Sequence, residues 1–109
     1  MTVTDVAKDA APVLDVLSDM IASSLEATTM DAKLLLQVRL GALVALDAAP
    51  ASYLFHLSVA ADVGLTVEDV QQVLIGLAPL VGSARIVSAT SKIARALGLA
   101  IAINDTAAE

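Results

Sequence analysis

Residues 34–46 read LLLQVRLGALVAL, and aliphatic side chains occupy almost every face that a helix of this segment would have. Asp31, just before it, has the side chain of a helix N-cap, so a helix is predicted from Asp31 to about Leu46. A helix that is apolar all round is a buried helix, placed centrally in the subunit or between subunits. Gln37 and Arg39 are the polar exceptions, and each needs a partner if it is buried.

Helical periodicity continues on both sides of this segment, and no stretch shows a sustained strand pattern. Before it, Asp9 is the expected N-cap of a helix whose apolar residues recur every three or four positions over residues 14–25. After it, Pro50 is expected in the first turn of a helix that ends at Gly64. The next helix begins at Thr66-Val67-Glu68-Asp69, which resembles a capping box with Asp in place of the usual Glu or Gln.

The last part of the chain predicts one more helix. Pro79 and Gly82 are expected to end or kink the helix that starts after Thr66, and a further helix is expected from about Ser83. Gly98 is expected to end or weaken that final helix. No linker, repeat or low-complexity run divides residues 1–109, so the prediction is a single-domain, all-α bundle of about five to six helices.

The composition adds a prediction about assembly. Hydrophobic residues make up 58% of the 109 residues and aromatic residues only 2%, so the apolar content is almost entirely aliphatic. The longest stretch without a charge, residues 70–84, contains two glycines and a proline and is shorter than the 18 or so residues that a membrane span requires. A domain of this size cannot bury so many apolar side chains alone, which predicts an obligate homo-oligomer.

Charge and cysteine content exclude several classes of partner and cofactor. The formal net charge is -6, and the few cations are scattered from Lys8 to Arg95, so neither nucleic acid nor an anionic membrane is an expected partner. No cysteine is present, which excludes disulfides, thiolate metal sites and thiol redox chemistry. No ligand pair surrounds the single His56, so no metal and no cofactor are predicted. The amino-terminal residues show no secretory signal, which favours the cytoplasm.

Several segments together resemble the carboxymuconolactone decarboxylase and alkyl hydroperoxidase D-like family. The resemblance begins with residues 34–46, continues through His56 and the run AADVGLTVEDV at residues 60–70, and includes LAPLVG at residues 77–82. It covers roughly residues 31–99 of the chain. It implies an all-helical bundle that assembles into a homotrimer or homohexamer.

The redox branch of this family resembles C-x-x-C-x-x-x-H, with a Glu twelve residues before the first Cys. Aligned on His56, this chain has Ser52 at the second Cys, Ala49 at the first and Gln37 at the Glu. Neither alanine nor an ordinary hydroxyl can reduce a peroxide and then form a disulfide. The thiol peroxidase activity of the family is therefore expected to be lost.

The decarboxylase branch does not depend on those thiols. The resemblance implies a lyase activity on a small carboxylated lactone or β-keto acid, with His56 as general acid or base. An anionic substrate would also need a cation, and Arg39 and Arg85 are the candidates. Ser52 and Gln37 are candidate pocket residues, because Ser52 shares a helix face with His56 and Gln37 could donate a hydrogen bond to it.

Two alternatives remain open from the sequence. In the first, the chain is a non-catalytic helical oligomer that keeps the family scaffold, and His56 is a core or interface residue. In the second, the oligomer encloses a cavity for an apolar ligand. Tyr53, the only tyrosine, is a candidate hydrogen-bond donor at the mouth of a pocket.

Overall fold

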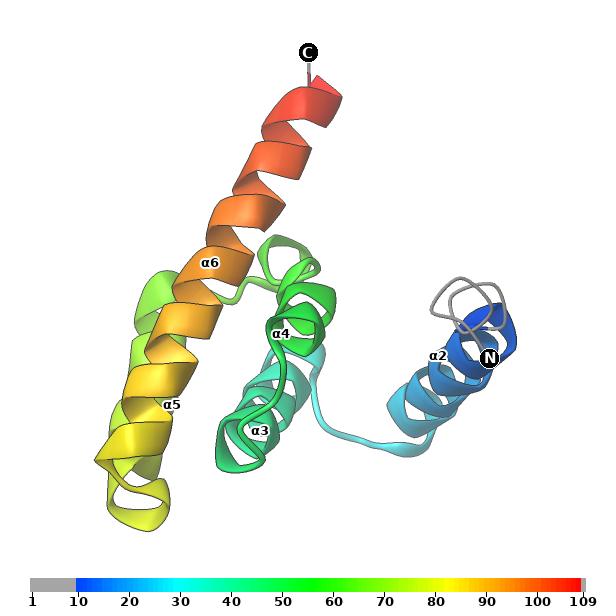
Figure 1. Cartoon of the computed structure of the whole chain (residues 1–109). Coiled ribbons are helices and arrows are strands. Elements are labelled where there is room, and N and C mark those ends of the chain that lie inside the picture. The colour runs from blue at the N-terminus through cyan, green and yellow to red at the C-terminus, as the bar shows by residue number, and fades with distance from the viewer. Residues whose placement is uncertain (1–9, 109) are drawn as a thin grey trace, which may run out of the picture. The chain divides into compact units, whose positions relative to one another are not determined.

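The computed structural model describes the backbone of residues 10–108 and the side chains of residues 10–98. Within these residues all regular structure is helical, in the order α2, α3, α4, the short 3₁₀ helix η1, α5 and α6 (Figure 1). The all-α prediction is confirmed for this part of the chain. The chain divides into two units, Met1–Met30 and Asp31–Glu109, which are described separately.

The described part of the first unit, from residue 10 onward, contains the amphipathic helix α2 (Ala10–Ala27). Its acidic residues, Asp15, Asp19 and Glu26, fall on one side of the helix, and its large apolar residues fall on the other. No residue of α2 is buried, and Leu14 and Leu17 of the predicted apolar stripe are exposed. The predicted N-cap of this helix, Asp9, lies outside the described residues.

The second unit begins with α3 (Ala32–Ala45), and its start confirms the prediction made from Asp31. The Asp31 carboxylate accepts a hydrogen bond from the backbone N–H of Leu34 at 2.8 Å, as an N-cap residue does. Helix α4 (Pro50–Leu57) then begins at Pro50, whose missing N–H is no loss in a first turn.

The end of α4 differs from the prediction of one helix up to Gly64. The α-helix stops at Leu57, and after a turn the chain forms η1 (Ala61–Val63). The backbone N–H groups of Gly64 and Leu65 donate to the carbonyls of Ala61 and Ala60, which is the bond pair of a Schellman motif. Gly64 has φ 76°, so the expected left-handed glycine is present although the helix before it is broken.

Helix α5 (Val67–Val81) begins with the predicted capping box. The Thr66 hydroxyl accepts from the Asp69 N–H at 3.1 Å, and the Asp69 carboxylate accepts from the Thr66 N–H at 2.9 Å. Pro79 lies inside the helix, and Gly82, with φ 84°, ends it. Helix α6 (Ser83–Ala108) follows at once and continues through Gly98, where the sequence predicted an end or a weak point.

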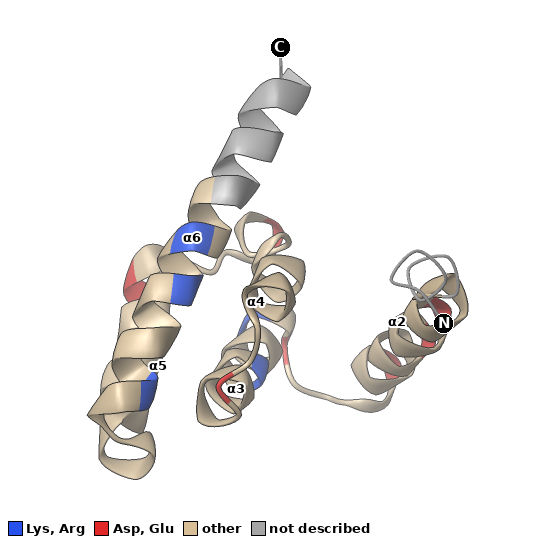
Figure 2. Cartoon of the chain, in the orientation of Figure 1, with Lys and Arg blue, Asp and Glu red and all other residues tan. Residues whose placement is uncertain are grey.

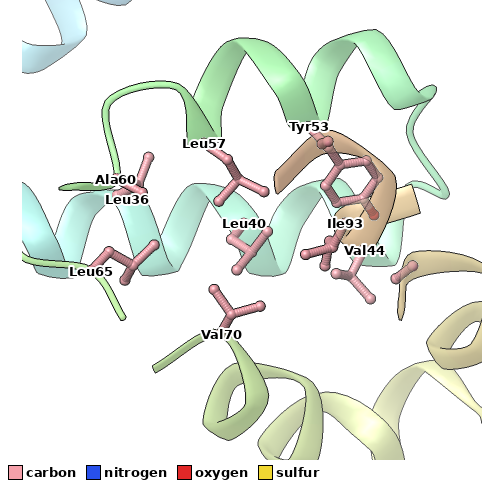
Figure 3. Packing of buried hydrophobic residues seen from close by; sticks show 11 residues of the cluster. Leu36, Leu40, Val44, Tyr53, Leu57, Ala60, Leu65, Val70 and Ile93 are labelled. Atoms are coloured by element: carbon pink, nitrogen blue, oxygen red, sulfur yellow. The ribbon is translucent and has the colours of Figure 1, made fainter. Parts of the chain in front are cut away.

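The core of the second unit is aliphatic except for one tyrosine, and α6 packs against α3, α4 and α5 around it (Figures 1 and 3). Its buried members are Leu36, Leu40, Val44, Tyr53, Leu57, Ala60, Leu65, Val70, Ala89, Ile93 and Ala96. Leu40 lies within this core with an exposed fraction of 0%.

Within one copy of the chain, helix α3 is buried on one face only. The predicted placement of this helix at the centre of the subunit, with all of its faces buried, is therefore wrong. Leu36, Leu40 and Val44 face the core, whereas Leu34 and Val38 on the opposite side are 45% and 51% exposed. The sequence gives both faces the same apolar character, so it cannot show which face the rest of the same chain covers. The other predicted placement of this helix, between subunits with a partner covering the outward face, remains a prediction.

The capping box supplies a stability prediction. Thr66→Ala removes the acceptor for an N–H of the first turn and is expected to lower the free energy of unfolding by about 1 kcal/mol. Thr66→Ser keeps the hydroxyl and is expected to cost much less. Urea denaturation followed by circular dichroism measures both, and an equal loss in the two variants would show that the hydroxyl is not the stabilising group.

Candidate functional site

His56 lies near the end of α4, and its ring is half-buried. Its Nδ1 is 2.9 Å from the main-chain carbonyl oxygen of Ser52, one helical turn earlier. A carbonyl can only accept, so Nδ1 carries a proton and donates it to this bond. The neutral ring then has its lone pair on Nε2, the atom available for proton transfer. The exposed Phe55 ring meets the imidazole edge to face, with centroids 5.7 Å apart.

The other predicted site residues are placed less favourably for catalysis. Ser52 contributes its backbone carbonyl to His56, so the pair is joined through the main chain and not as a nucleophile with its base. Gln37 is half-buried on α3, and the described part of the chain shows no hydrogen bond between Gln37 and His56. Arg39 is half-buried on the same helix and already has an interaction partner.

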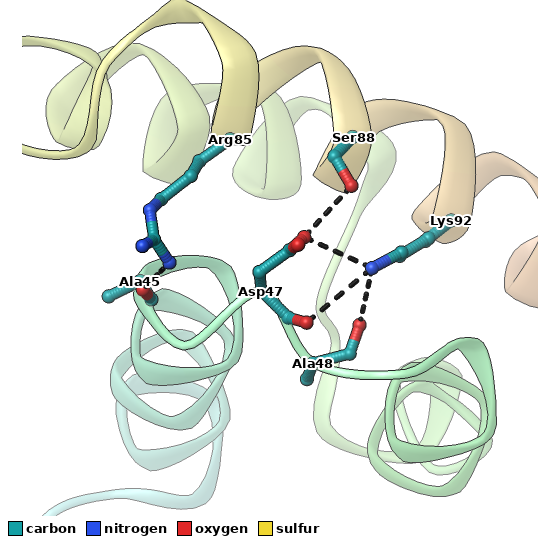
Figure 4. A network of polar contacts seen from close by, with 6 residues as sticks. All are labelled: Ala45, Asp47, Ala48, Arg85, Ser88 and Lys92. Carbon is teal, nitrogen blue, oxygen red and sulfur yellow. Dashed lines mark hydrogen bonds and ion pairs between the residues drawn. The ribbon is translucent and has the colours of Figure 1, made fainter.

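The most extensive polar cluster joins α6 to the loop between α3 and α4 (Figure 4). Arg85 donates to the carbonyl of Ala45 at 2.6 Å, at the C-terminal end of α3. Lys92 donates to the carbonyl of Ala48 at 2.9 Å and pairs with the Asp47 carboxylate at 3.0 Å. Both cations therefore compensate the negative end of α3, where carbonyls have no helical partner.

Asp47 holds an unusual backbone conformation in this cluster. Its φ is 51°, the left-handed region, and the bonds Asp47 N–H to Val44 O and Ala48 N–H to Leu43 O make a second Schellman motif. Glycine usually occupies this position, because a side chain there is strained. Here the carboxylate is fixed by the Lys92 ammonium and by the Ser88 hydroxyl at 2.8 Å.

This cluster is not predicted by the sequence pattern. Arg85, Ser88 and Lys92 are three and four residues apart, so they lie on one face of a helix. This spacing is the signal in the sequence that points to the cluster. Their partners lie some forty positions earlier in the chain, so the pattern alone could not identify them. Arg85, proposed from sequence as a substrate clamp, is placed by the structure against a backbone carbonyl.

The cluster predicts a specific order of stability among Asp47 variants. Asp47→Ala loses the carboxylate contacts and keeps the backbone strain, whereas Asp47→Gly loses the contacts but relieves the strain. The expected order of unfolding free energies is therefore wild type above Asp47→Gly above Asp47→Ala, measured by thermal denaturation. An alanine variant at least as stable as the glycine variant would contradict the strain argument.

The same carboxylate adds a pH dependence. Hydrogen bonds from Lys92 and then Ser88 lower the pKa of Asp47 below its ordinary value of 3.8. A lowered folded-state pKa gives stability that is present above 3.8 and is lost as the pH falls through the folded-state pKa. Asp69, whose pKa is lowered by the Thr66 backbone N–H and then by Lys33 at 3.1 Å, acts in the same direction.

Tyr53 corrects a further prediction, because it does not lie at the mouth of a pocket. Its exposed fraction is 0%, and its ring packs in the core with Val44 and Ile93 (Figure 3). Burial, and secondarily the charge of Asp47, raise the pKa of the Tyr53 phenol above 10.0. Its hydroxyl is the one buried side-chain polar atom of the described residues without a hydrogen-bond partner.

This hydroxyl leads to a stabilising substitution. A buried polar group without a partner costs roughly 1–3 kcal/mol. Tyr53→Phe keeps the ring and removes that cost, so it is expected to raise the free energy of unfolding by about 1 kcal/mol. Chemical denaturation of the variant beside wild type measures the difference. A clear loss of stability in Tyr53→Phe would mean that the phenol has a hydrogen-bond partner, which would contradict this prediction.

Two further properties bear on function. Among the described residues, no three side chains of histidine, aspartate or glutamate gather into a group that could hold a metal ion. Across the same part of the chain, no helix combines the length and apolar character needed to cross a bilayer.

Comparisons with protein-family models, with curated proteins and with solved structures found no match. Function is therefore inferred from the chain's own residues and from the resemblance of its segments to the carboxymuconolactone decarboxylase and alkyl hydroperoxidase D-like family.

Proposed function

We propose that this chain is a carboxymuconolactone decarboxylase-like protein that works as a homo-oligomer, a trimer or a hexamer. The observation that carries the proposal is the number of large apolar side chains of the second unit that the rest of that unit leaves exposed. They occur on all four α-helices of the second unit and on its turns: Leu34, Val38, Leu46, Phe55, Val59, Val67, Ile75, Leu80 and Val87. Apolar surface on this scale is typical of an interface.

The family assignment is supported by the local structure of the segments that carry the resemblance. The run at residues 60–70 forms η1, the left-handed Gly64 and the capping box that begins α5. Glycine and threonine in this run thus have definite structural roles, the first ending one helix and the second starting the next. Local capping explains both residues, and a helical bundle of the kind that the resemblance implies has a place for both.

His56 is the residue proposed to act on the substrate, a small carboxylated lactone or β-keto acid. When carbon dioxide leaves such a molecule, the broken C–C bond leaves its electron pair on the remaining carbon, which must gain a proton. The Nε2 of a protonated His56 can donate that proton and later recover one from water. The Nδ1 bond to the Ser52 carbonyl fixes the ring so that Nε2 is the atom that transfers it.

A non-catalytic oligomer is the second candidate, and specific contacts favour it. Gln37 stands where the family has an acid, and an amide cannot take up a proton. Arg85 and Lys92 are bound to backbone carbonyls of the α3–α4 connection, which leaves them less available for a substrate carboxylate. In this proposal His56 is a structural residue that caps its own helix turn. The thiol peroxidase activity is expected to be lost in both proposals, because Ala49 and Ser52 stand at the two thiol positions.

Activity measured across a size-exclusion profile tests the two candidates. Fractions of the purified full chain would be assayed for carbon dioxide release from a panel of small carboxylated lactones and β-keto acids. Turnover that follows the oligomer peak is the expected result. If the oligomer forms but none of the panel is turned over, the non-catalytic candidate is favoured, and turnover of an organic peroxide with a thiol reductant would contradict both.

A further inference from the structure

The α3–α4 connection, residues 46–49, is fixed to the second unit more by polar bonds than by burial. Three of its four residues are exposed, and Ala48 alone is half-buried against the core. Figure 2 shows basic residues along α6, and one of them, Lys92, holds the Asp47 carboxylate at 3.0 Å. The Ser88 hydroxyl of the same helix donates to that carboxylate at 2.8 Å (Figure 4). Exposed contacts of this kind stabilise a structure only weakly, so little holds the connection against α6.

Two costly features lie close to this connection. Asp47 has the left-handed backbone conformation, φ 51°, which is strained for a residue with a side chain. The Tyr53 hydroxyl is buried and has no hydrogen-bond partner among the described residues. Its ring packs with Val44 in the core that Ala48 helps to cover (Figure 3). Burial, and then the charge of Asp47, raise the pKa of the Tyr53 phenol, so the carboxylate acts on the phenol. Strained backbone and unpaired buried groups tend to gather where a structure changes conformation.

From these observations we infer that the α3–α4 connection opens away from α6 as a local unit while the helices stay folded. In the open state the Asp47 carboxylate leaves Ser88 and Lys92, and the Asp47 backbone leaves the left-handed region. Water then reaches the Tyr53 hydroxyl. Opening removes both costs of the closed state and breaks only a few solvent-exposed contacts, as local opening requires. The Lys92–Asp47 ion pair is the contact that keeps the connection closed. This inference does not depend on the proposed oligomer or on an activity of His56.

Hydrogen exchange of two backbone amides measures the opening. The N–H groups of Asp47 and Ala48 donate to the carbonyls of Val44 and Leu43, and both bonds require the left-handed conformation at Asp47. Because a local opening lets these amides exchange without unfolding of the chain, their exchange rates report the open population. Nuclear magnetic resonance of the full chain follows each amide, with the Leu40 amide inside α3 as the reference.

Lys92→Met and Lys33→Met are a matched pair of substitutions. Each removes the ammonium of an ion pair of nearly the same length, 3.0 Å to Asp47 and 3.1 Å to Asp69. Lys92→Met is expected to speed the exchange of the Asp47 and Ala48 amides at least about threefold, the change that the loss of one exposed ion pair produces. Lys33→Met, which breaks a contact between α3 and α5, is expected to leave both amides unchanged.

Two further variants test the opening from other contacts. Tyr53→Phe removes the hydroxyl that the closed state leaves unpaired, so it is expected to slow the same exchange at least about fivefold. A phenol that stays buried in both states would contribute equally to both and would leave the exchange unchanged. Ser88→Ala removes one bond to Asp47 and is expected to speed the exchange, which provides the measurement if Lys92→Met does not fold.

Faster exchange confined to the Asp47 and Ala48 amides in Lys92→Met or Ser88→Ala, together with slower exchange in Tyr53→Phe, is the expected result. Exchange at these two amides that changes in step with the Leu40 amide in every variant would mean that their bonds break only when the whole unit unfolds, and it would overturn the inference. An equal acceleration in Lys33→Met, or unchanged exchange in Tyr53→Phe, would overturn it as well.

Discussion

Leu40→Ala is expected to lower the free energy of unfolding by about 2–5 kcal/mol, a large part of the stability of a small domain. Leu40 lies in the middle of α3 with no exposed surface, and it packs in one cluster with residues of α4, α5 and α6. The substitution removes buried methyl groups and leaves a cavity that helices packed on several sides can fill only in part. Urea denaturation at a fixed protein concentration measures the effect.

Leu46→Ala is the matched control for this prediction. It removes the same atoms from a side chain that is mostly exposed at the C-terminal end of α3, so it is expected to cost less than about 1 kcal/mol. Similar losses in Leu40→Ala and Leu46→Ala would contradict the assignment of the core to one face of α3.

His56→Gln is expected to lower the rate of carbon dioxide release from a turned-over substrate by about 10²–10⁴-fold, the range for a general acid or base. Glutamine can keep a polar contact with the Ser52 carbonyl, but it has no group that exchanges a proton near neutral pH. The effect is expected mainly in kcat, because the lost proton transfer belongs to the transition state and not to substrate binding.

Ser52→Ala is the control for His56. It removes the hydroxyl but keeps the backbone carbonyl that orients the imidazole, so it is expected to retain activity within about a few-fold. A His56→Gln variant that melts at a lower temperature but keeps full turnover would show that the histidine is structural. A Ser52→Ala variant as inactive as His56→Gln would show that the hydroxyl takes part, contrary to the geometry.

Features determined by local backbone chemistry are predictable from this sequence. Asp31, Pro50 and Thr66 begin helices because a cap or a first-turn proline acts within three or four residues. The imperfect box at Thr66 forms with both of its bonds, since an aspartate carboxylate reaches the N-cap N–H as a longer acid would. Gly64 likewise adopts the left-handed conformation that its position predicts.

Features that depend on distant parts of the chain are not predictable in this way. The apolar pattern of α3 does not show which of its faces meets the core, because both faces carry aliphatic residues. The contacts of Lys92 and Ser88 with Asp47 join segments far apart in the sequence. Whether His56 lies beside a cation or an acid depends on such long-range placement. The resemblance implies a site with several residues around His56, and the described contacts of one chain do not bring all of these residues together.

The mass of the wild-type chain in solution tests the central claim most directly. The second unit, taken by itself, leaves large apolar side chains exposed on each of its four α-helices, so the chain is expected to be a stable homo-oligomer at low micromolar concentration. Multi-angle light scattering after gel filtration should give a molar mass that is three or six times the 11.1 kDa of one chain. A single species at 11.1 kDa would contradict the account.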